Sequence, residues 1–450
     1  MSNVLSIILA AGQGTRMKSD KIKVLHHVAG KPMIKHVVDG ITDFSSKIVV
    51  VIGHQGDEVN ECLGNNNEIK TVIQEKQLGT GHAVMQARNY LESHYGPVLV
   101  LYGDTPLLRE ETLKRFIELQ QREKAACTVL TAQIDNPAGY GRVIKNQHGY
   151  IEKIVEEKDA SRQEKAVNEI NSGVCCFDSR LLLEALDNID NNNAQGEYYL
   201  TDTIGYLTDQ GKAVVPMLIE KNSEIIGIND RVNLARAEKV LRDRNNKKHM
   251  MNGVTIIDPN TTYIDSQVEI GKDTILYPFT YLEGNTKIGT HCTIAPHSRI
   301  NDGEIGDYVN IKDHSIVMES KIGNETNIGP FAYIRPGCNI SEQAKIGDFV
   351  ELKKAEIGKG TKVPHLSYVG DASIGQGTNI GAGTIFANYD GQEKHKTTVG
   401  DNVFIGSNTT LIAPVKVDNK AKTGAGSVVT RDIKEGTTVV GVPAHVFKKE

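Results

Sequence analysis

The chain has 450 residues, of which 24% are charged and 39% hydrophobic, and its formal net charge is −5. A chain of this length predicts two or three domains, each large enough for its own hydrophobic core. The composition is that of an ordinary soluble globular protein, and the weak negative charge gives no hint of a nucleic-acid or membrane surface, although local basic clusters are not excluded.

Neither the cysteines nor the amino terminus indicates secretion. The apolar run at residues 4–11 has no basic region before it, so it predicts a buried strand and not a signal peptide. No apolar stretch approaches membrane-spanning length. The cysteines form no CxxC pair, which favours free thiols in a reducing cytoplasm over disulfides or zinc: they are Cys62, Cys127, Cys175, Cys176, Cys292 and Cys338. We therefore expect a cytoplasmic protein with neither a membrane nor a nucleic acid as partner.

Residues 1–227 alternate between strand-like and helix-like segments. Short, bounded apolar runs predict strands at 4–9, 47–53, 97–102 and 127–134. Helix-length stretches lie between them, for example at 32–42 and 110–124. This alternation predicts a Rossmann-like α/β domain, a mostly parallel sheet covered by helices, with ligands at the carboxyl ends of the strands.

A glycine-rich turn follows the first strand, in the sequence Leu9-Ala10-Ala11-Gly12-Gln13-Gly14-Thr15-Arg16-Met17. Such a turn lets backbone N–H groups approach phosphate, and Arg16 and Lys23 are cations within plausible reach. The third glycine of a dinucleotide fingerprint is missing and there is no P-loop. From the residues of this segment alone, a nucleotide-binding loop and a plain tight turn are about equally supported.

Residues 228–251 predict one helix that links two domains, with Gly253 as its stop signal. Its basic residues could suggest nucleic acid, but acidic residues are interspersed and no aromatic residue could stack on bases. We interpret the segment as a solvated connector. Its expected apolar stripe is thin: Val232, Leu234, Ala235, Val240 and Leu241.

Residues 252–450 repeat with a period of six, which fits neither a helix nor a free strand. The period predicts a hexapeptide β-helix of roughly ten coils, whose aliphatic side chains stack inward and whose corners hold small residues. Glycine often follows the aliphatic residue, and we expect it there for backbone angles that other residues resist. The repeating positions are Ile270, Leu276, Leu282, Ile288, Ile294, Ile300, Ile305, Ile311, Val317, Ile322, Ile328, Ile334, Ile340, Ile346, Leu352, Ile357, Val363, Val369, Ile374, Ile380, Val399, Ile405, Leu411 and Val417.

Polar residues interrupt this repeat in three places. Arg335 and Lys353 put cations on coils that otherwise prefer small residues, and His365 lies beside an inward position. The repeat also breaks at residues 388–394, which we interpret as an extruded loop over a ligand or a neighbouring chain. A histidine suits proton removal at neutral pH, so His365 is the candidate general base of this unit.

The motifs of the first domain together resemble the sugar-1-phosphate nucleotidyltransferase family. With the β-helix they are similar, over essentially the whole chain, to the bacterial bifunctional branch that joins such a domain to a hexapeptide acetyltransferase. The resemblance rests on Leu9-x-x-Gly-x-Gly-Thr-Arg-Met with Lys23-Val24-Leu25, on Gln74 with residues 77–83, on Tyr102-Gly103-Asp104, and on the segments 139–142, 155–158, 169–173, 195–199 and 227–229.

The resemblance implies that the first domain transfers a uridylyl group from UTP to N-acetylglucosamine-1-phosphate. Mg²⁺ would be held by Asp104 and Asn229, while Arg16 and Lys23 neutralise the triphosphate and the leaving pyrophosphate. The implied contacts with UDP-N-acetylglucosamine are Leu9, Ala10, Ala11, Gly12, Lys23, Gln74, Gly79, Thr80, Tyr102, Gly103, Asp104, Gly141, Glu156, Asn171 and Asn229.

For the β-helix the resemblance implies a left-handed coil, a homotrimer, and acetyl transfer from acetyl-CoA to glucosamine-1-phosphate at a site between subunits. His365 would be the base, oriented by Asn388. The implied contacts with glucosamine-1-phosphate are Arg335, Lys353, Tyr368, Asn379 and Lys394, and those with acetyl-CoA are Ala382, Asn388, Tyr389, Ser407 and Ala425. The product would serve peptidoglycan synthesis.

The chain departs from the family pattern at two positions. Gly441 stands where the relatives have an arginine that touches CoA, although the ending Gly-Val-Pro-Ala is common among hexapeptide acyltransferases. Ile22 replaces the usual proline before Lys23.

Two other functions are compatible with parts of the sequence. The β-helix could be a regulatory scaffold on a single nucleotidyltransferase, or the whole chain a non-catalytic assembly subunit. One set of polar side chains in the β-helix argues against the first alternative, because a scaffold coil does not need them together. The set is Arg335, Lys353, His365, Tyr368 and Asn388. Asp104 and Asn229 argue against the second.

Overall fold

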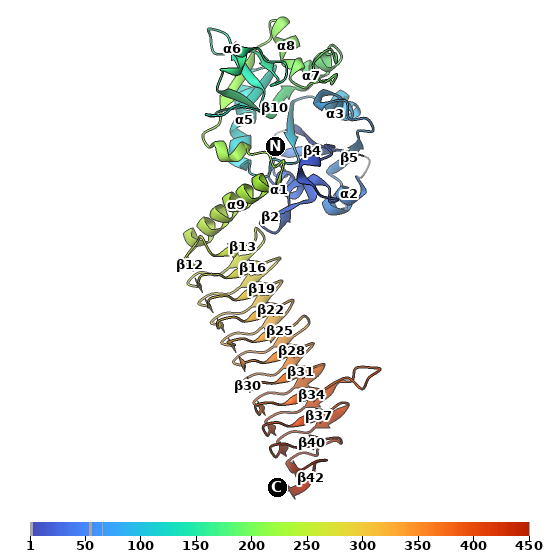
Figure 1. Ribbon diagram of the computed structural model, residues 1–450, viewed down its shortest axis with the longest axis vertical. Helices are drawn as coiled ribbons and strands as arrows, with labels where there is room; N and C mark the ends of the chain where they lie inside the picture. The colour runs from blue at the N-terminus through green and yellow to red at the C-terminus, as the bar shows by residue number, and fades with distance from the viewer. Residues whose placement is uncertain (1–2, 54–55, 65, 450) are drawn as a thin grey trace. The chain divides into compact units, whose positions relative to one another are not determined.

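The computed structural model describes residues 3–53, 56–64 and 66–449, and its contacts divide the chain into two compact units, Met1–Leu241 and Arg242–Glu450. The first unit is built on a nine-stranded sheet with the order β11-β7-β10-β6-β1-β4-β5, to which β8 and β9 attach through β10 (Figure 1). Strands β11 and β7 pair in parallel, as do β6, β1, β4 and β5, whereas β10 runs antiparallel to β6, β7 and β8, and β8 runs antiparallel to β9. The strands are β1 Val4–Ala10, β4 Ser45–Ile52, β5 Ile69–Ile73, β6 Pro97–Tyr102, β7 Cys127–Gln133, β8 Arg142–Lys145, β9 Ile151–Val155, β10 Glu169–Asp178 and β11 Val214–Leu218, with a small hairpin of β2 His27–Val28 and β3 Lys31–Pro32 beside them.

Alternation along β1 places its side chains in two different cores. Val4 and Ile8 belong to one core, and Leu5 and Ile7 to the other. The first core is completed by α1 Met33–Asp39, α2 Asp57–Leu63 and α5 Glu110–Glu123. The second is completed by α3 Thr80–Met85, α4 Arg88–Glu92, α7 Ser179–Leu186 and α8 Asp202–Asp209. The unit is thus a three-layer α/β fold, and the predicted Rossmann-like class is confirmed. Short helices η1 Thr15–Met17, η2 Lys23–Leu25, η3 Asn222–Ile225 and α6 Arg162–Lys165 lie in its loops.

Helix α9 Arg231–Met251 is not a solvated connector. Its first half packs Ala237 and Leu241 into a core of the first unit, whereas Val232 is 61% exposed and Ala235 is exposed, so the predicted stripe was wrong at those two positions. Within the second unit, the side chain of Asn246 is fully buried and donates hydrogen bonds to carbonyl oxygens of the first coil. The helix ends near Gly253, which has a positive φ, as predicted. Tertiary contacts, which the sequence pattern does not contain, decide which face is buried.

The second unit is a left-handed parallel β-helix of three flat faces, as predicted, and its strands stack as successive rungs (Figure 1). The first face holds β12 Thr255–Ile256, β15 Ile275–Leu276, β18 Thr293–Ile294, β21 Asn310–Ile311, β24 Asn327–Ile328, β27 Lys345–Asp348, β30 Lys362–His365, β33 Asn379–Ile380, β36 Phe404–Ile405, β39 Lys422–Thr423, β41 Thr437–Val440 and β42 His445–Lys449. The second holds β13 Tyr263–Ile264, β16 Tyr281–Glu283, β19 Arg299–Asn301, β22 Ile316–Met318, β25 Tyr333–Ile334, β28 Glu351–Lys353, β31 Tyr368–Gly370, β34 Ile385–Ala387, β37 Thr410–Ile412 and β40 Val428–Val429. The third holds β14 Glu269–Ile270, β17 Lys287–Ile288, β20 Glu304–Ile305, β23 Lys321–Ile322, β26 Asn339–Ile340, β29 Glu356–Ile357, β32 Ala372–Ile374, β35 Thr397–Val399 and β38 Val415–Val417.

The repeating aliphatic residues form one continuous core along the coil, and small residues such as Thr274 and Ser298 are buried at its corners. The role expected of the glycines was wrong at most of these positions. Positive φ angles occur mainly at other residues, for example Phe279 and Phe349. At Gly271, in contrast, a Cβ atom would lie 2.6 Å from the backbone of the next coil. These glycines therefore permit close approach between coils and do not supply unusual dihedral angles.

Both ends of the β-helix are covered. The second half of α9 meets the first coil, and β42 pairs antiparallel with β41 at the last one. Helix α9 thus binds carbonyl oxygens of the first coil, and β42 covers the outer edge of β41. No helix in the described part of the chain is both long and apolar enough to cross a membrane.

Candidate functional site

The turn after β1 is built against Lys23. Gly14 has a φ of +63°, and a Cβ atom there would lie 2.6 Å from the Cβ of Lys23. Only glycine therefore tolerates both the left-handed backbone and the close neighbour. The turn and η2, which begins at Lys23, are locked together by this contact.

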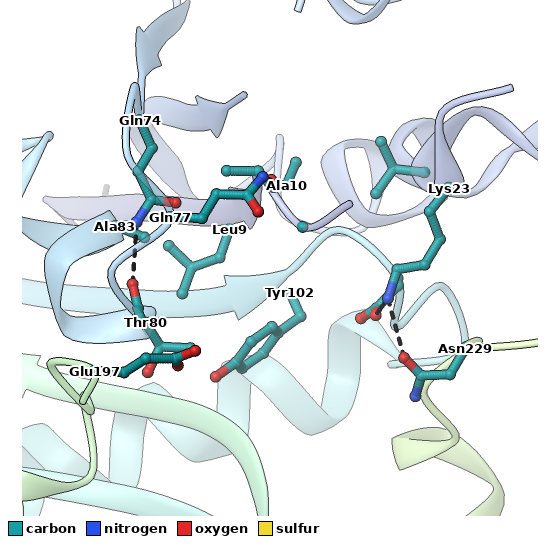
Figure 2. A pocket seen from close by; sticks show the side chains of 15 residues that line it. Leu9, Ala10, Lys23, Gln74, Gln77, Thr80, Ala83, Tyr102, Glu197 and Asn229 are labelled. Atoms are coloured by element: carbon teal, nitrogen blue, oxygen red, sulfur yellow. Dashed lines mark hydrogen bonds and ion pairs between the residues drawn. The ribbon is translucent and has the colours of Figure 1, made fainter. Parts of the chain in front are cut away.

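Two predicted residues, Asp104 and Asn229, contact the ammonium group of Lys23. It is paired with the carboxylate of Asp104 at the end of β6, and it donates a hydrogen bond of 3.0 Å to Oδ1 of Asn229. Arg16 also donates to that oxygen, at 3.0 Å. Figure 2 shows Lys23 and Asn229 reaching toward one another from different segments. Two side-chain oxygens thus converge where a positive charge already stands.

This convergence fits a magnesium site as far as the donor set goes. Asp104 and Asn229 offer hard oxygen ligands, which Mg²⁺ prefers. Within the described residues, no group of three or more histidine, cysteine, aspartate or glutamate side chains could hold a metal ion. The protein would therefore supply few ligands, and phosphate oxygens and water would supply the rest, as is usual for Mg²⁺ bound with nucleotides.

A cavity of about 320 Å³ opens between the β1 turn and the loop before α3 (Figure 2). It brings together most of the residues predicted for the nucleotide. They are Leu9, Ala10, Ala11, Gly12, Lys23, Gln74, Gly79, Thr80, Tyr102, Asp104 and Asn229, and the cavity is completed by Val24, Gln77, Ala83 and Glu197. Gln77 and Ala83 belong to a motif that the sequence singled out without assigning them a role.

Hydrogen bonds hold the walls of this cavity in place. Gln74 is buried and donates to the carbonyl oxygen of Gly79 at 3.1 Å, while Gln77 donates to that of Ala11 at 2.5 Å. Gly79 has a φ of +106°, and a Cβ there would lie 2.5 Å from the carbonyl oxygen of Tyr198. The loop before α3 is thus fixed on one side to the β1 turn and on the other to the segment around Tyr198.

A second cavity of about 170 Å³ adjoins the first and contains the predicted Glu156 and Asn171. Thr80, Tyr102 and Glu197 line both cavities. The other lining residues are Gly173, Cys175, Gln195, Tyr199, Leu200 and Thr201. Of these, Gly173, Gln195 and Tyr199 lie in sequence motifs that the analysis had recognised, whereas no sequence signal marked Cys175, Leu200 or Thr201.

Glu156 is one of two acids that line the second cavity, the other being Glu197. Burial raises the pKa of the Glu156 carboxyl, and a hydrogen bond of 3.0 Å from the Thr201 hydroxyl partly opposes that rise. Burial also raises the pKa of Tyr102, which therefore keeps its proton. The second cavity thus offers hydroxyl and carboxyl groups that suit the hydroxyls of a sugar.

Two predicted contact residues line neither cavity. Gly103 donates from its backbone to the carbonyl oxygen of Leu9, and a Cβ there would lie 3.0 Å from Ile34. Gly141 accepts a hydrogen bond of 2.9 Å from the backbone of Asn171. Both glycines hold lining residues in place in this structure.

In the β-helix, one corner aligns several predicted residues at the end of the first face. The register pairs Asp348 with His365, and the backbone bonds continue the same row through Ala382 and Ser407. Ala425 extends the row in the next coil, because Gly406 packs against its backbone. We call this row the corner row. The predicted base and the small residues predicted for acetyl-CoA therefore lie on successive coils of one corner.

The contact of His365 differs from the prediction. Its Nδ1 is hydrogen-bonded to the carboxylate of Asp348, whereas Asn388 donates to Asp371. The expected orientation of His365 by Asn388 was therefore wrong within this chain. Asp348 and Asp371 were missed, because each precedes its partner by one coil and neither interrupts the repeat.

The predicted cations lie on the second face and beside it. Lys353 approaches Asp371 at 3.9 Å, and Arg335 pairs with Glu351 at 2.8 Å. The nearby ammonium of Lys353 lowers the pKa of Lys394. A Cβ at Gly370 would clash with the hydroxyl of Tyr368, so this glycine makes room for that ring. The face therefore carries three cations near a tyrosine hydroxyl, two of them beside acids of the same face or corner.

Two predicted residues are not at the corner of His365 within this chain. Asn379 begins β33, three residues before Ala382 of the corner row. Tyr389 is 59% exposed in the loop after β34, and its hydroxyl donates to the carbonyl oxygen of Gly391. That loop stands out from the stack of coils (Figure 1).

Comparisons with known proteins cover both units. The model of the nucleotidyl transferase family matches residues 5–225, and that of the bacterial transferase hexapeptide family matches residues 267–302 and 396–431. The chain is 51% identical to the bifunctional protein GlmU of Geobacillus sp. (strain WCH70) over 445 residues, which cover 99% of this chain and 96% of that protein. It is 49% identical to the GlmU protein of Acetivibrio thermocellus over 100% of this chain and 97% of that protein. With the GlmU protein of Heliobacterium modesticaldum the identity is 51%, over 97% of this chain and 94% of the relative.

Proposed function

Because the chain belongs to the family of bifunctional GlmU proteins, we propose that its two units catalyse successive steps toward UDP-N-acetylglucosamine. The β-helix transfers an acetyl group from acetyl-CoA to the amine of glucosamine-1-phosphate. The first unit then transfers a uridylyl group from UTP to the product and releases pyrophosphate. The observation that supports this most is that each unit gathers a separate set of cations beside a cavity or a row of small residues.

In the first unit, catalysis consists mainly of positioning and charge neutralisation, since phosphoryl transfer needs little covalent chemistry from the protein. Arg16 and Lys23 neutralise the phosphates of UTP and of the leaving pyrophosphate. Asp104 and Asn229 would hold Mg²⁺, which when bound neutralises further phosphate charge. Lys23 leaves these two oxygens when the metal and the triphosphate enter, because one ammonium now occupies both.

The two adjoining cavities support a division of substrates. The nucleotide would occupy the cavity beside Lys23, read by Gln74 and the backbone at Gly79. The sugar would occupy the cavity of Glu156 and Asn171. The two cavities share the lining residues Thr80, Tyr102 and Glu197. The sugar phosphate can therefore reach the α-phosphate of UTP while each substrate stays in its own cavity. Such alignment contributes to the rate by proximity.

In the β-helix, His365 takes a proton from the ammonium of glucosamine-1-phosphate, and the free amine attacks the thioester carbonyl. The carbon–sulfur bond then breaks, the attacking nitrogen gives up its second proton to the leaving sulfur, and CoA leaves as the thiol. Arg335, Lys353 and Lys394 hold the sugar phosphate, with Tyr368 and Asn379 on the sugar. The small residues Ala382, Ser407 and Ala425 leave space along the corner row for the pantetheine chain, beside Asn388 and Tyr389.

The proposal includes a homotrimer in the cytoplasm, formed through the β-helix. The second unit exposes a stack of rings at one corner: Phe279, His297, His314, Phe331 and Phe349 have neighbouring centroids 4.7 to 5.2 Å apart. Association of coils side by side would remove this aromatic ladder from water. We retain the division into residues 1–227, the linker 228–251 and residues 252–450. Sedimentation velocity tests the trimer, and a species with the mass of one chain at micromolar concentration would contradict it.

One assay tests both activities. The protein is incubated with glucosamine-1-phosphate, acetyl-CoA, UTP and Mg²⁺, while thiol and pyrophosphate release are followed. We expect both signals, and we expect His365→Ala to abolish thiol release but to retain pyrophosphate release when N-acetylglucosamine-1-phosphate is supplied. Pyrophosphate release without thiol release from the unaltered protein would leave a single nucleotidyltransferase with a scaffold. Undiminished thiol release from the variant would exclude His365 as the base.

A further inference from the structure

We propose that Asp348 is a positioning residue of the acetyl-transfer site, whose carboxylate holds His365 in the tautomer that leaves Nε2 free to accept a proton. The inference rests on the proposed role of His365 as the base. It adds a residue that no interruption of the hexapeptide repeat marks, because Asp348 follows the Gly347 of an ordinary coil.

The contact itself is direct. Asp348 ends β27 and His365 ends β30, and the register places them opposite one another on adjacent coils. The carboxylate meets Nδ1 of the ring. Contact with His365 lowers the pKa of Asp348, as does the charge of Lys345 on the same strand. The acid is thus ionised at neutral pH and can only accept a hydrogen bond.

The tautomer follows from that acceptor. Because an ionised carboxylate cannot donate, Nδ1 must carry the proton of the neutral ring, and the lone pair lies on Nε2. A base that removes a proton from an ammonium needs this free lone pair. The carboxylate also stabilises the imidazolium that forms when the proton arrives, as acids do behind other catalytic histidines.

The coil geometry does not need an acid at this position. In earlier coils the corner row holds Pro278, Pro296 and Asp313, and each accepts the same backbone hydrogen bond that Asp348 accepts from Leu366. A proline there forms the corner equally well. The side chain of Asp348 is therefore available for a task other than holding the backbone.

The neighbours on the other side of His365 fit this task. The next two positions of the corner row are Ala382 and Ser407, which have no charge. The ring is about half exposed, since 52% of the His365 side chain is accessible. Within the described corner row, Asp348 is therefore the acid beside the imidazole, and the other side of the ring borders the row proposed for the pantetheine chain.

The test compares Asp348→Asn with Asp313→Asn, the matched acid of the same row two coils earlier. For Asp348→Asn we expect kcat of thiol release to fall roughly 10- to 100-fold, which is the usual effect of removing a residue that orients a functional histidine by a hydrogen bond. KM for both substrates should stay within about twofold. The acidic limb of the kcat/KM profile should move to lower pH, because loss of the negative charge favours the neutral ring. Asp348→Glu should restore part of the rate, and Asp313→Asn should behave as the unaltered protein.

Pyrophosphate release by the first unit of the same chain and the unfolding temperature serve as controls for folding. An Asp348→Asn protein with unchanged kcat and pH profile overturns the inference, as does a loss confined to KM or to the unfolding temperature. If Asp348→Asn does not fold, Asp348→Glu decides instead. A folded Glu variant that releases no thiol, or whose acidic limb moves to lower pH, overturns the inference, because this variant keeps the negative charge. The proposed function fails by a different result, namely no thiol release from the unaltered protein or undiminished release from His365→Ala.

Discussion

Lys23 donates a hydrogen bond to the side-chain oxygen of Asn229 across 206 residues of sequence. The same ammonium pairs with Asp104, so one positive charge satisfies two oxygens that we propose as magnesium ligands. The first unit is therefore organised around the ammonium of Lys23, which the proposed Mg²⁺ would replace at these two oxygens.

The first prediction concerns that charge. Lys23→Met keeps an unbranched side chain against Gly14 but removes the ammonium. We expect kcat for pyrophosphate release to fall roughly 100- to 1000-fold, the usual effect of deleting one group that stabilises transition-state charge. Thiol release should not change. Lys21→Met, two residues away and exposed, is the matched control and should retain the rate; equal activity of both variants would contradict the assignment.

Chelation should separate the two activities. With EDTA in excess we expect pyrophosphate release to stop, because Asp104 and Asn229 would lack the ion that they are proposed to hold, while thiol release continues. Asp104→Asn should raise the Mg²⁺ concentration needed for half-maximal activity about tenfold or more, since a neutral amide is a weaker ligand for a hard cation. A metal titration of both reactions measures this, and parallel loss of both activities would be inconsistent with it.

The contributions of Glu156 and Glu157 to folding stability should change with pH in opposite directions. Burial raises the pKa of Glu156, so between its unfolded and folded pKa values the native state holds more protons, and stability falls as pH rises through that window. Glu156→Gln should therefore raise the unfolding temperature at pH 8 and leave it unchanged near pH 4.

Arg142 holds the pKa of the neighbouring Glu157 below its usual value by hydrogen bonding. That pairing stabilises the fold above the unfolded pKa and is lost as pH falls through the folded one. Glu157→Gln should lower the unfolding temperature at pH 8 and have no effect at low pH. Calorimetry from pH 4 to pH 8 measures both variants, and shifts of the same sign at pH 8 would refute the argument.

Two lysines of the loop after β34 should differ in their effect on acetyl transfer. The pKa of Lys394 is lowered by the ammonium of Lys353, so the two charges lie close together and would gain from a phosphate between them. We expect Lys394→Met to raise KM for glucosamine-1-phosphate about tenfold. Lys396 instead approaches Glu356, at 3.5 Å, and Lys396→Met should change KM less than twofold. Initial-rate measurements decide, and a similar rise in both would place the phosphate elsewhere.

Two neighbours on β34 should differ in their effect on stability. Phe386 is fully buried in the core of the β-helix, whereas Ile385 is 41% exposed. Phe386→Ala should lower the free energy of unfolding of the second unit by roughly 3 to 5 kcal/mol, and Ile385→Ala by about 1 kcal/mol or less. Calorimetry of the whole chain measures both, and pyrophosphate release at 25 °C should be retained by each variant.

The period of six predicted the β-helix because it is a local signal: each inward residue, such as Ile294 or Ile346, repeats the environment of the last. The buried face of α9 was predicted less well, since a helix with few apolar residues is oriented by what it packs against. Val232 matched the stripe by spacing but is exposed, whereas Asn246 is buried because it caps backbone carbonyls.

The residues of the first cavity lie in contiguous motifs and could be recognised there. The partners of His365 and Asn388 in the β-helix could not be recognised from the sequence, because the coil length varies by one residue at each slip of the repeat. Whether Asp348 faces His365 depends on the exact register across such a slip between Leu352 and Ile357. Counting repeats places Asn388 within two coils of His365, which suggested a contact between them, but its amide donates to Asp371.

The loop between β34 and β35 shows how this architecture admits change. Phe386 and Val399 are buried at the inward positions of their faces, on either side of the loop. Ile374 pairs with Val399 in the register of an ordinary coil, so the loop does not shift the pairing. The added residues leave at a corner and return to it, so the length of the chain there is uncoupled from the register of the core. A β-helix can therefore lengthen, shorten or rewrite a substrate loop in one evolutionary step, without a compensating substitution in the coils above or below.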